Sequence, residues 1–137
     1  MNLEMVKTFM KEVGWGFLAT SDGKQVGVRP MGSCVWMDNE LWCATSEGTE
    51  KTVQLRKIPY AEFCFCDKEG KHIRISGHCT ISINNDDKLR LYEAVPILKN
   101  YIKDPTVPKY LVIRMKPDRI RLMAEAGKGY EDIEMPK

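Results

Sequence analysis

Short strand-like segments with few helices between them are the feature that most limits how this chain can fold. Four such segments follow one another between residues 16 and 46, and the turn signals Asp22-Gly23 and Asp38-Asn39 each separate two of them. A parallel sheet needs a crossover, usually a helix, between paired strands, whereas helical patterns occur here at only two or three places. We therefore predict a mainly β fold: a small barrel of six to seven mostly antiparallel strands with peripheral helices.

The helical patterns lie outside the predicted strands. An amphipathic helix is expected from about Leu3 to Val13, where apolar residues recur at helical spacing. A short helix is expected over Lys51–Lys57, before a proline, and a third over Asp87–Glu93. Pro96 restarts the helical pattern after it. Two last strands, YLVIRMKP and RIRLMAE, complete the predicted fold.

The composition favours one small domain that spans residues 1–137. The chain has 137 residues, which is enough for one hydrophobic core, and 43% of them are apolar. A formal charge of +2 gives no reason to expect a nucleic-acid partner, and no apolar run is long enough to span a bilayer. The N-terminus lacks the pattern of a signal peptide, so a cytoplasmic location without a membrane partner is expected.

The segment from Leu41 to Pro59, LWCATSEGTEKTVQLRKIP, carries the strongest functional signal. An apolar strand runs into a loop that contains Thr45, Ser46 and Thr49, and Lys51 then opens a short helix. Hydroxyl groups, free backbone N–H groups of a first helical turn and a lysine ammonium suit an anion, above all a phosphate. The alternative is that Ser46 or Thr49 only caps the helix.

The preceding segment, VGVRPMGSCVW, supports the anion hypothesis. It carries Arg29, Pro30 and Met31 in the middle of a strand-like run. A proline cannot donate a hydrogen bond to a sheet, so Pro30 is expected at an edge strand or a bulge. Arg29 could then face the same anion or a planar ligand, although a solvated surface arginine remains an alternative.

With these motifs the chain resembles the FMN-binding split-barrel family, the group related to pyridoxamine 5′-phosphate oxidase. The resemblance runs from roughly Val13 to Met123 and includes the strand KHIRISGHCTI, with Gly77 at its bend. It implies that the strand with the Arg-Pro-Met run lies along the flavin and that Thr45 lies near it. It also implies that Lys51 reaches the FMN phosphate and that His72 stands where the oxidases carry a flavin-contacting glutamine.

Two departures from the oxidase pattern are visible. The oxidases place an arginine immediately before the phosphate lysine, whereas this chain has Glu50, so Arg29, Thr52 or Gln54 is expected to replace that contact. The C-terminal arginine and histidine that hold pyridoxal phosphate in the oxidases are missing, so genuine pyridoxamine phosphate oxidase activity is not expected. The candidate cofactor-binding residues are Arg29, Pro30, Met31, Thr45, Ser46, Lys51, Thr52, Gln54 and His72.

The expected place of the flavin follows from the size of the barrel. A small closed barrel fills its interior with side chains, so the ligand must bind outside it. The resemblance implies a homodimer that clasps two FMN molecules between its subunits. Trp15, Trp36 and Trp42 could supply apolar surface for that interface or stack on the flavin, and each could equally belong to the core.

Three functions remain open at this stage. The first is an FMN-dependent oxidoreductase that uses a nicotinamide donor and a small planar acceptor. The second is a flavin-binding or redox-sensing protein without turnover, and the third is the same fold with haem or a deazaflavin as its ligand. The cofactor would carry the chemistry, and no residue is predicted to act as a catalytic acid or base.

The cysteines are expected to be reduced thiols that pack as small apolar groups. Five are present, all in strand-like segments. Cys64, Cys66, His78 and Cys79 could be assembled into a zinc site, but their spacing lacks the C-x-x-C form of a metal knuckle. Core packing is therefore expected in place of a metal site.

Overall fold

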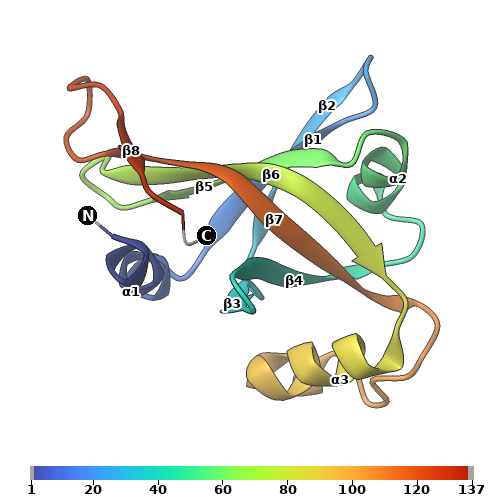
Figure 1. The fold of residues 1–137 in the computed structure, drawn as a ribbon. Helices are drawn as coiled ribbons and strands as arrows, with labels where there is room; N and C mark the ends of the chain where they lie inside the picture. The colour runs from blue at the N-terminus through green and yellow to red at the C-terminus, as the bar shows by residue number, and fades with distance from the viewer. Residues whose placement is uncertain (1, 136–137) are drawn as a thin grey trace.

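The computed structural model describes residues 2–135, which form one strongly curved antiparallel sheet with helices around it (Figure 1). The strands are β1 (Gly16–Ser21), β2 (Val26–Met31), β3 (Val35–Met37), β4 (Glu40–Ser46), β5 (Tyr60–Cys66), β6 (His72–Ser82), β7 (Tyr110–Met123) and β8 (Glu131–Ile133). The helices are α1 (Leu3–Val13), α2 (Glu50–Lys57), α3 (Asn85–Ala94) and the 3₁₀ helix η1 (Pro96–Asn100).

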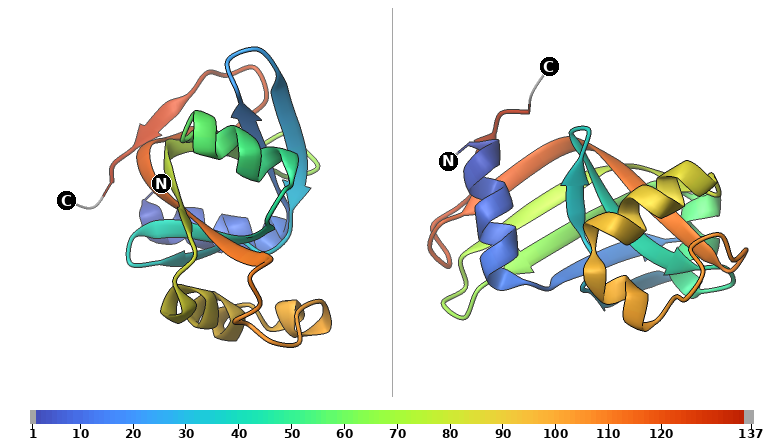
Figure 2. Two further views of the ribbon diagram at one scale, coloured as in Figure 1. Left: turned by 90° about the vertical axis from the view of Figure 1, so that its right-hand side faces the viewer. Right: turned by 90° about the horizontal axis from the view of Figure 1, so that it is seen from below.

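The strand order confirms a split-barrel type of fold. The strands follow the order β2-β1-β5-β6-β7-β4-β3, every neighbouring pair is antiparallel, and β8 pairs with β7. Viewed end on, the sheet curls round on itself (Figure 2, left). No pairing joins the two edge strands β2 and β3 within residues 2–135, so the barrel is not closed. The sheet has eight strands, whereas the sequence predicted six to seven.

The helices expected from the sequence are confirmed. Helix α1 buries Val6, Phe9 and Met10, and α2 begins one residue before the predicted start. Helix α3 begins after Asn84, whose side chain accepts hydrogen bonds from two amides of the first turn. No helix among the described residues is long and apolar enough to cross a lipid bilayer.

The predicted break between YLVIRMKP and RIRLMAE is wrong, because β7 continues through Pro117. The register between β6 and β7 shifts at this point: Ser76 pairs with Arg119, and Gly77 pairs with Pro117. One extra residue on β7, Asp118, lies between these pairs, as in a β-bulge. A bulge tolerates the missing N–H of a proline, which explains why the strand does not end there. The short edge strand β8 was not predicted.

The two faces of the sheet bury different cores. The larger core fills the inside of the curved sheet with residues from β1, β4, β5, β6 and β7, and α1 packs against it. A smaller core lies between β4, β7 and the α3–η1 segment, and it contains Trp42. The guanidinium carbons of Arg90 and Arg114 lie 5.0 and 4.4 Å from the ring of Trp42. Trp42 is therefore a core residue, Trp36 is half-buried, and Trp15 is exposed.

The bulge generates a testable prediction about Gly77. A Cβ atom at this position would lie 2.2 Å from the carbonyl oxygen of Lys116, so Gly77→Ala must push β6 and β7 apart. We expect the free energy of unfolding, measured by chemical denaturation, to fall by about 1–3 kcal/mol. Thr80→Ala, on the exposed side of β6, is the control and should change it by less than about 0.5 kcal/mol. Equal stability of the two variants would contradict the argument.

Candidate functional site

Helix α2 starts with a first turn that no side chain caps. Thr49 occupies the N-cap position, but it makes no side-chain capping hydrogen bond. Its hydroxyl group instead donates to the carbonyl oxygen of Ser46, at 2.9 Å. The capping alternative considered from the sequence is therefore not what Thr49 does, and the first-turn amides of α2 can serve an anion.

Three threonine hydroxyl groups fix the junction between β4 and α2. The Oγ1 atom of Thr45 lies 2.8 Å from that of Thr52 and 3.3 Å from that of Thr49. Thr52 also donates to the carbonyl oxygen of Ser46, at 3.0 Å. Thr45 and Thr52 are buried, so their hydroxyl groups hold the loop in place from the protein side.

Lys51 is the cation at this site that no carboxylate among residues 2–135 pairs with. Its ammonium group makes no hydrogen bond or ion pair with any of the residues 2–135. Partial burial lowers the pKa of Lys51 below its usual value; the Cys43 side chain opposes this shift, and the nearby charge of Arg29 adds to it. A bound anion would reverse the lowering, because it would compensate the positive charge.

Arg29 lies close to the same helix start, but its charge is already compensated. From β2, its Nη1 atom donates to the carbonyl oxygen of Leu18 at 3.2 Å and to the Thr20 hydroxyl oxygen at 2.6 Å. Its Nη2 atom lies 2.7 Å from Oε1 of Glu50, the first residue of α2. A Cβ atom on Gly27 would lie 2.1 Å from the same carboxylate oxygen. A larger residue at position 27 would therefore displace the Glu50 carboxylate from this ion pair. The pair ties β2 to α2.

Thr52 and Gln54 point into the protein. Gln54 is 3% exposed; its Oε1 atom accepts a hydrogen bond from the Thr20 hydroxyl, and its Nε2 atom donates to the carbonyl oxygen of Gln25. A continuous chain of hydrogen bonds thus runs from Arg29 through Thr20 to Gln54. These bonds attach α2 to β1 and β2, and whether Thr52 or Gln54 contacts a flavin stays a prediction.

Strand β2 carries the Arg-Pro-Met run at the edge of the sheet, as the proline predicted. Its side chains alternate: Arg29 and Met31 face inward, and Pro30 is exposed. The outward face of β1 and β2 also exposes Phe17, Val26 and Val28, which are 48%, 68% and 67% accessible. Sequence reasoning missed these three as a group, although the spacing of two between the valines was a signal.

His72 lies far from the α2 loop within one copy of the chain. Its ring nitrogens lie 2.9 Å from the carbonyl oxygen of Gly70 and 2.8 Å from the hydroxyl oxygen of Tyr130. The end of α2 lies beside Cys79, whose amide donates to the Pro59 carbonyl oxygen. Cys79 is seven positions after His72 on β6, which corresponds to about 20 Å. Figure 1 shows α2 and β8, the strand that begins after Tyr130, at opposite ends of the sheet.

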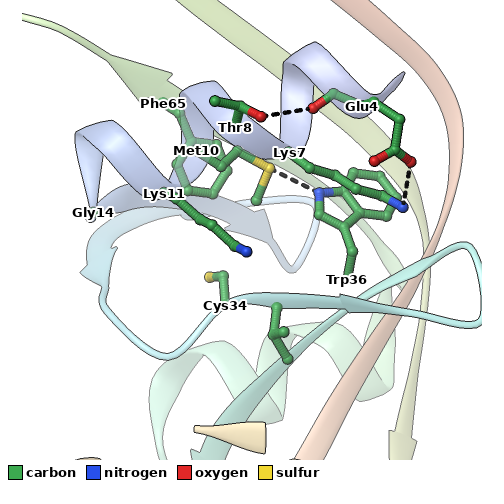
Figure 3. A pocket seen from close by; sticks show the side chains of 10 residues that line it. Glu4, Lys7, Thr8, Met10, Lys11, Gly14, Cys34, Trp36 and Phe65 are labelled. Carbon is green, nitrogen blue, oxygen red and sulfur yellow. Dashed lines mark hydrogen bonds and ion pairs between the residues drawn. The ribbon is translucent and has the colours of Figure 1, made fainter. Parts of the chain in front are cut away.

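A separate cavity of about 390 Å³ lies between α1 and the segment that leads into β3 (Figure 3). The residues that line it include Lys7, Met10, Lys11, Cys34, Trp36 and Phe65. The indole N–H of Trp36 donates to the sulfur atom of Met10, at 2.8 Å, and this contact closes one wall. None of the residues that line the cavity belongs to the α2 loop.

Solved structures share this fold. A NimC/NimA family protein from Clostridium acetobutylicum is 24% identical, with a TM-score of 0.82 over 96% of this chain and 90% of that one. General Stress Protein 26 from Bacillus anthracis is 19% identical, with a TM-score of 0.72 over 93% and 98%. A pyridoxamine 5′-phosphate oxidase-related, FMN-binding protein from Nostoc punctiforme is 15% identical, with a TM-score of 0.69 over 95% and 87%.

The sequence itself carries the family assignment. No curated protein matches the chain. The family model described as pyridoxamine 5′-phosphate oxidase matches residues 3–124, which is most of the chain and includes the α2 loop, β2 and His72. The resemblance found in the sequence motifs is thereby confirmed, and the chain belongs to the pyridoxamine 5′-phosphate oxidase family.

Proposed function

We propose that this protein binds FMN and acts as an FMN-dependent oxidoreductase, transferring electrons between a nicotinamide donor and a small planar acceptor. The observation that carries the proposal is the pair formed by Lys51 and the uncapped first turn of α2. An ammonium group without a partner beside free helix amides suits a phosphate. The family includes a member described as FMN-binding, which supports this choice of phosphate ligand.

The residues of the loop fit a phosphate group. The hydroxyl group of Ser46, like the ammonium group of Lys51, makes no hydrogen bond within the described chain and is partly exposed. Both groups donate, as phosphate oxygens require. Glu50 carries the opposite charge, but its carboxylate is held by Arg29. The threonine cluster keeps the phosphate-binding groups in place before the ligand arrives, which lowers the entropic cost of binding.

When bound, the flavin ring supplies the hydride and electron chemistry. The chain would position the ring along β2, where Pro30 and Met31 line the strand. The amides of Gly32 and Ser33 follow β2 and donate no backbone hydrogen bond within the described residues, so they can face the polar edge of the ring. Because Glu50 already compensates the charge of Arg29, these backbone amides are the groups that would favour a reduced, anionic ring.

A homodimer with FMN at its interface forms part of the proposal. Phe17, Val26 and Val28 on β1 and β2 form an exposed apolar patch, which is typical of a surface that a partner protein buries. The patch lies at the edge of the sheet, where another chain can add to it. About 20 Å of β6 separates His72 from Cys79, which lies beside the end of α2 in the same chain. If His72 contacts the flavin, it does so from the second copy, across this interface.

The absorption spectrum of the purified protein is the first test of the proposed function. We expect a flavin spectrum, release of FMN on heating, and oxidation of NADH or NADPH in the presence of quinone or nitroaromatic acceptors. A flavin spectrum without turnover would reduce the proposal to flavin binding. A colourless protein that also fails to bind added FMN would refute it, and haem or deazaflavin would be tested next.

The role of Lys51 can be separated from its effect on folding. We expect Lys51→Ala to weaken FMN binding about 10- to 100-fold, because a charge-assisted contact contributes about 1.5–3 kcal/mol. Riboflavin lacks the phosphate, so its affinity should not change. Lys57→Ala, on the exposed last turn of α2, is the matched control and should leave both affinities unchanged. Fluorescence titration measures both ligands, and equal losses for FMN and riboflavin would show that Lys51 supports only the fold.

The placement of His72 has its own test. We expect His72→Ala to lower the affinity for FMN or the rate of flavin reduction, measured by titration and by stopped-flow absorbance. His78→Ala serves as the control, because His78 is exposed on the same strand and packs edge-on against Tyr60. An unchanged dissociation constant together with unchanged reduction kinetics would remove His72 from the site.

A further inference from the structure

Cys34 and Cys43 stand opposite each other at the open end of the β3–β4 hairpin. The hairpin turns through Asp38 and Asn39, both with positive φ (55° and 59°), as in a two-residue type I′ turn. Its last paired residues are Val35 and Trp42, so the next pair along the register is Cys34 and Cys43. The strands stay together beyond this point, because the Ala44 amide donates to the hydroxyl oxygen of Ser33 at 3.1 Å.

The register also fixes the type of pair. In a two-residue hairpin the pair next to the turn, Met37 and Glu40, exchanges backbone hydrogen bonds, and hydrogen-bonded and non-hydrogen-bonded pairs alternate from there. Cys34 and Cys43 therefore form a non-hydrogen-bonded pair. The Cα atoms of such a pair lie about 4.5 Å apart, at the lower end of the range of about 4.4–6.8 Å that disulfides occupy.

Both sulfur atoms face the same core. Cys43 is fully buried in the larger core, and Cys34 packs against that core from its rim. A hydrogen bond with the Cys34 side chain, together with complete burial, raises the pKa of Cys43 well above its usual value. All five cysteines are free thiols in this structure, so the hairpin register brings Cys34 and Cys43 face to face in their reduced form.

Two other cysteine pairs within residues 2–135 lie near each other in the sheet, but neither is placed to form a bridge. Cys43 on β4 and Cys79 on β6 have β7 between them, which separates their backbones by about 10 Å. Cys64 and Cys66 are two residues apart on β5, so their side chains leave the strand about 7 Å apart. Both separations exceed the Cβ distance of about 3.5–4.5 Å in a disulfide.

The two cysteines differ in their access to solvent. Cys34 lines the cavity between α1 and β3, together with Lys7 and Lys11 (Figure 3). Cys43 has no exposed surface. A small oxidant that enters the cavity therefore meets Cys34 first, with Cys43 behind it.

We propose that Cys34 and Cys43 are a reactive thiol pair that hydrogen peroxide converts into an intramolecular disulfide. The Cys34 sulfur attacks one peroxide oxygen, the O–O bond breaks, and the thiol proton leaves with the departing hydroxide as water. The Cys43 sulfur then attacks the sulfenic acid of Cys34, the S–O bond breaks, and a second water leaves with the Cys43 proton. Two thiols are oxidised and one peroxide is reduced. The proposed disulfide depends only on the geometry of the β3–β4 hairpin, so it does not require bound FMN.

The test treats the full-length protein with hydrogen peroxide and then blocks the remaining thiols with an alkylating agent. We expect two of the five thiols to be lost and the intact mass to fall by two hydrogens, with both changes reversed by dithiothreitol. Cleavage after Glu40 separates the two cysteines into different peptides, so only a bridge keeps them joined. Cys66→Ser, which removes the exposed cysteine of β5, is the control and should lose the same two thiols.

Two single variants test the order of the two steps. In Cys43→Ala the sulfenic acid has no partner, so dimedone should label Cys34 after peroxide treatment. In Cys34→Ala, Cys43 should stay a free thiol under the same conditions. A wild-type protein that keeps all five thiols, bridges other cysteines, or carries a sulfinic acid on Cys34 beside a free Cys43 would overturn the proposal.

Discussion

The pairing of β6 with β7 is the constraint on which the rest of the structure depends. The two strands pair along the whole of β6, and their bulge at Gly77 and Pro117 bends the sheet halfway along. Strand β5 pairs with the outer side of β6 and β4 with the outer side of β7. Helix α2 follows β4 and leads into β5, so it connects two strands that lie on either side of the β6–β7 pair. The start of α2, where the anion would bind, is therefore placed by the central ladder.

Much of the fold could be predicted from the sequence because its signals are local. Helix α1 shows in the spacing of its apolar residues, and β6 in its alternation and its glycine. Pro117 misled the prediction, because a proline taken alone favours a strand end. Only the register against β6 shows that Gly77 lies opposite Pro117 and that β7 has one extra residue beside this pair. Such strand pairings join segments that are distant in the sequence, so they cannot be predicted from local sequence patterns.

The candidate site, like the fold, could be predicted only in part from the sequence. The order of Thr45, Ser46 and Lys51 around a helix start was visible in the sequence, and the structure places them together. Their hydrogen bonding could not be predicted: the hydroxyl group of Thr45 bonds that of Thr52, while the hydroxyl group of Ser46 and the ammonium group of Lys51 make no hydrogen bond within residues 2–135. The partnership of Arg29 with Glu50 spans 21 residues and depends on the packing of β2 against α2. Hydrogen-bond partners of this kind decide which groups remain for a ligand.

Strand β4 links the thiol pair to the anion site, because Cys43 and Thr45 are two residues apart and both face inward. The two sites nevertheless stay separable. A disulfide between residues already at bridging distance needs no change of register, so it would leave β4 in place. The start of α2 is held independently, by the threonine hydroxyl groups and by the Arg29–Glu50 ion pair. Oxidation of the hairpin should therefore stiffen the segment between β2 and β3 without displacing the groups that would hold a phosphate.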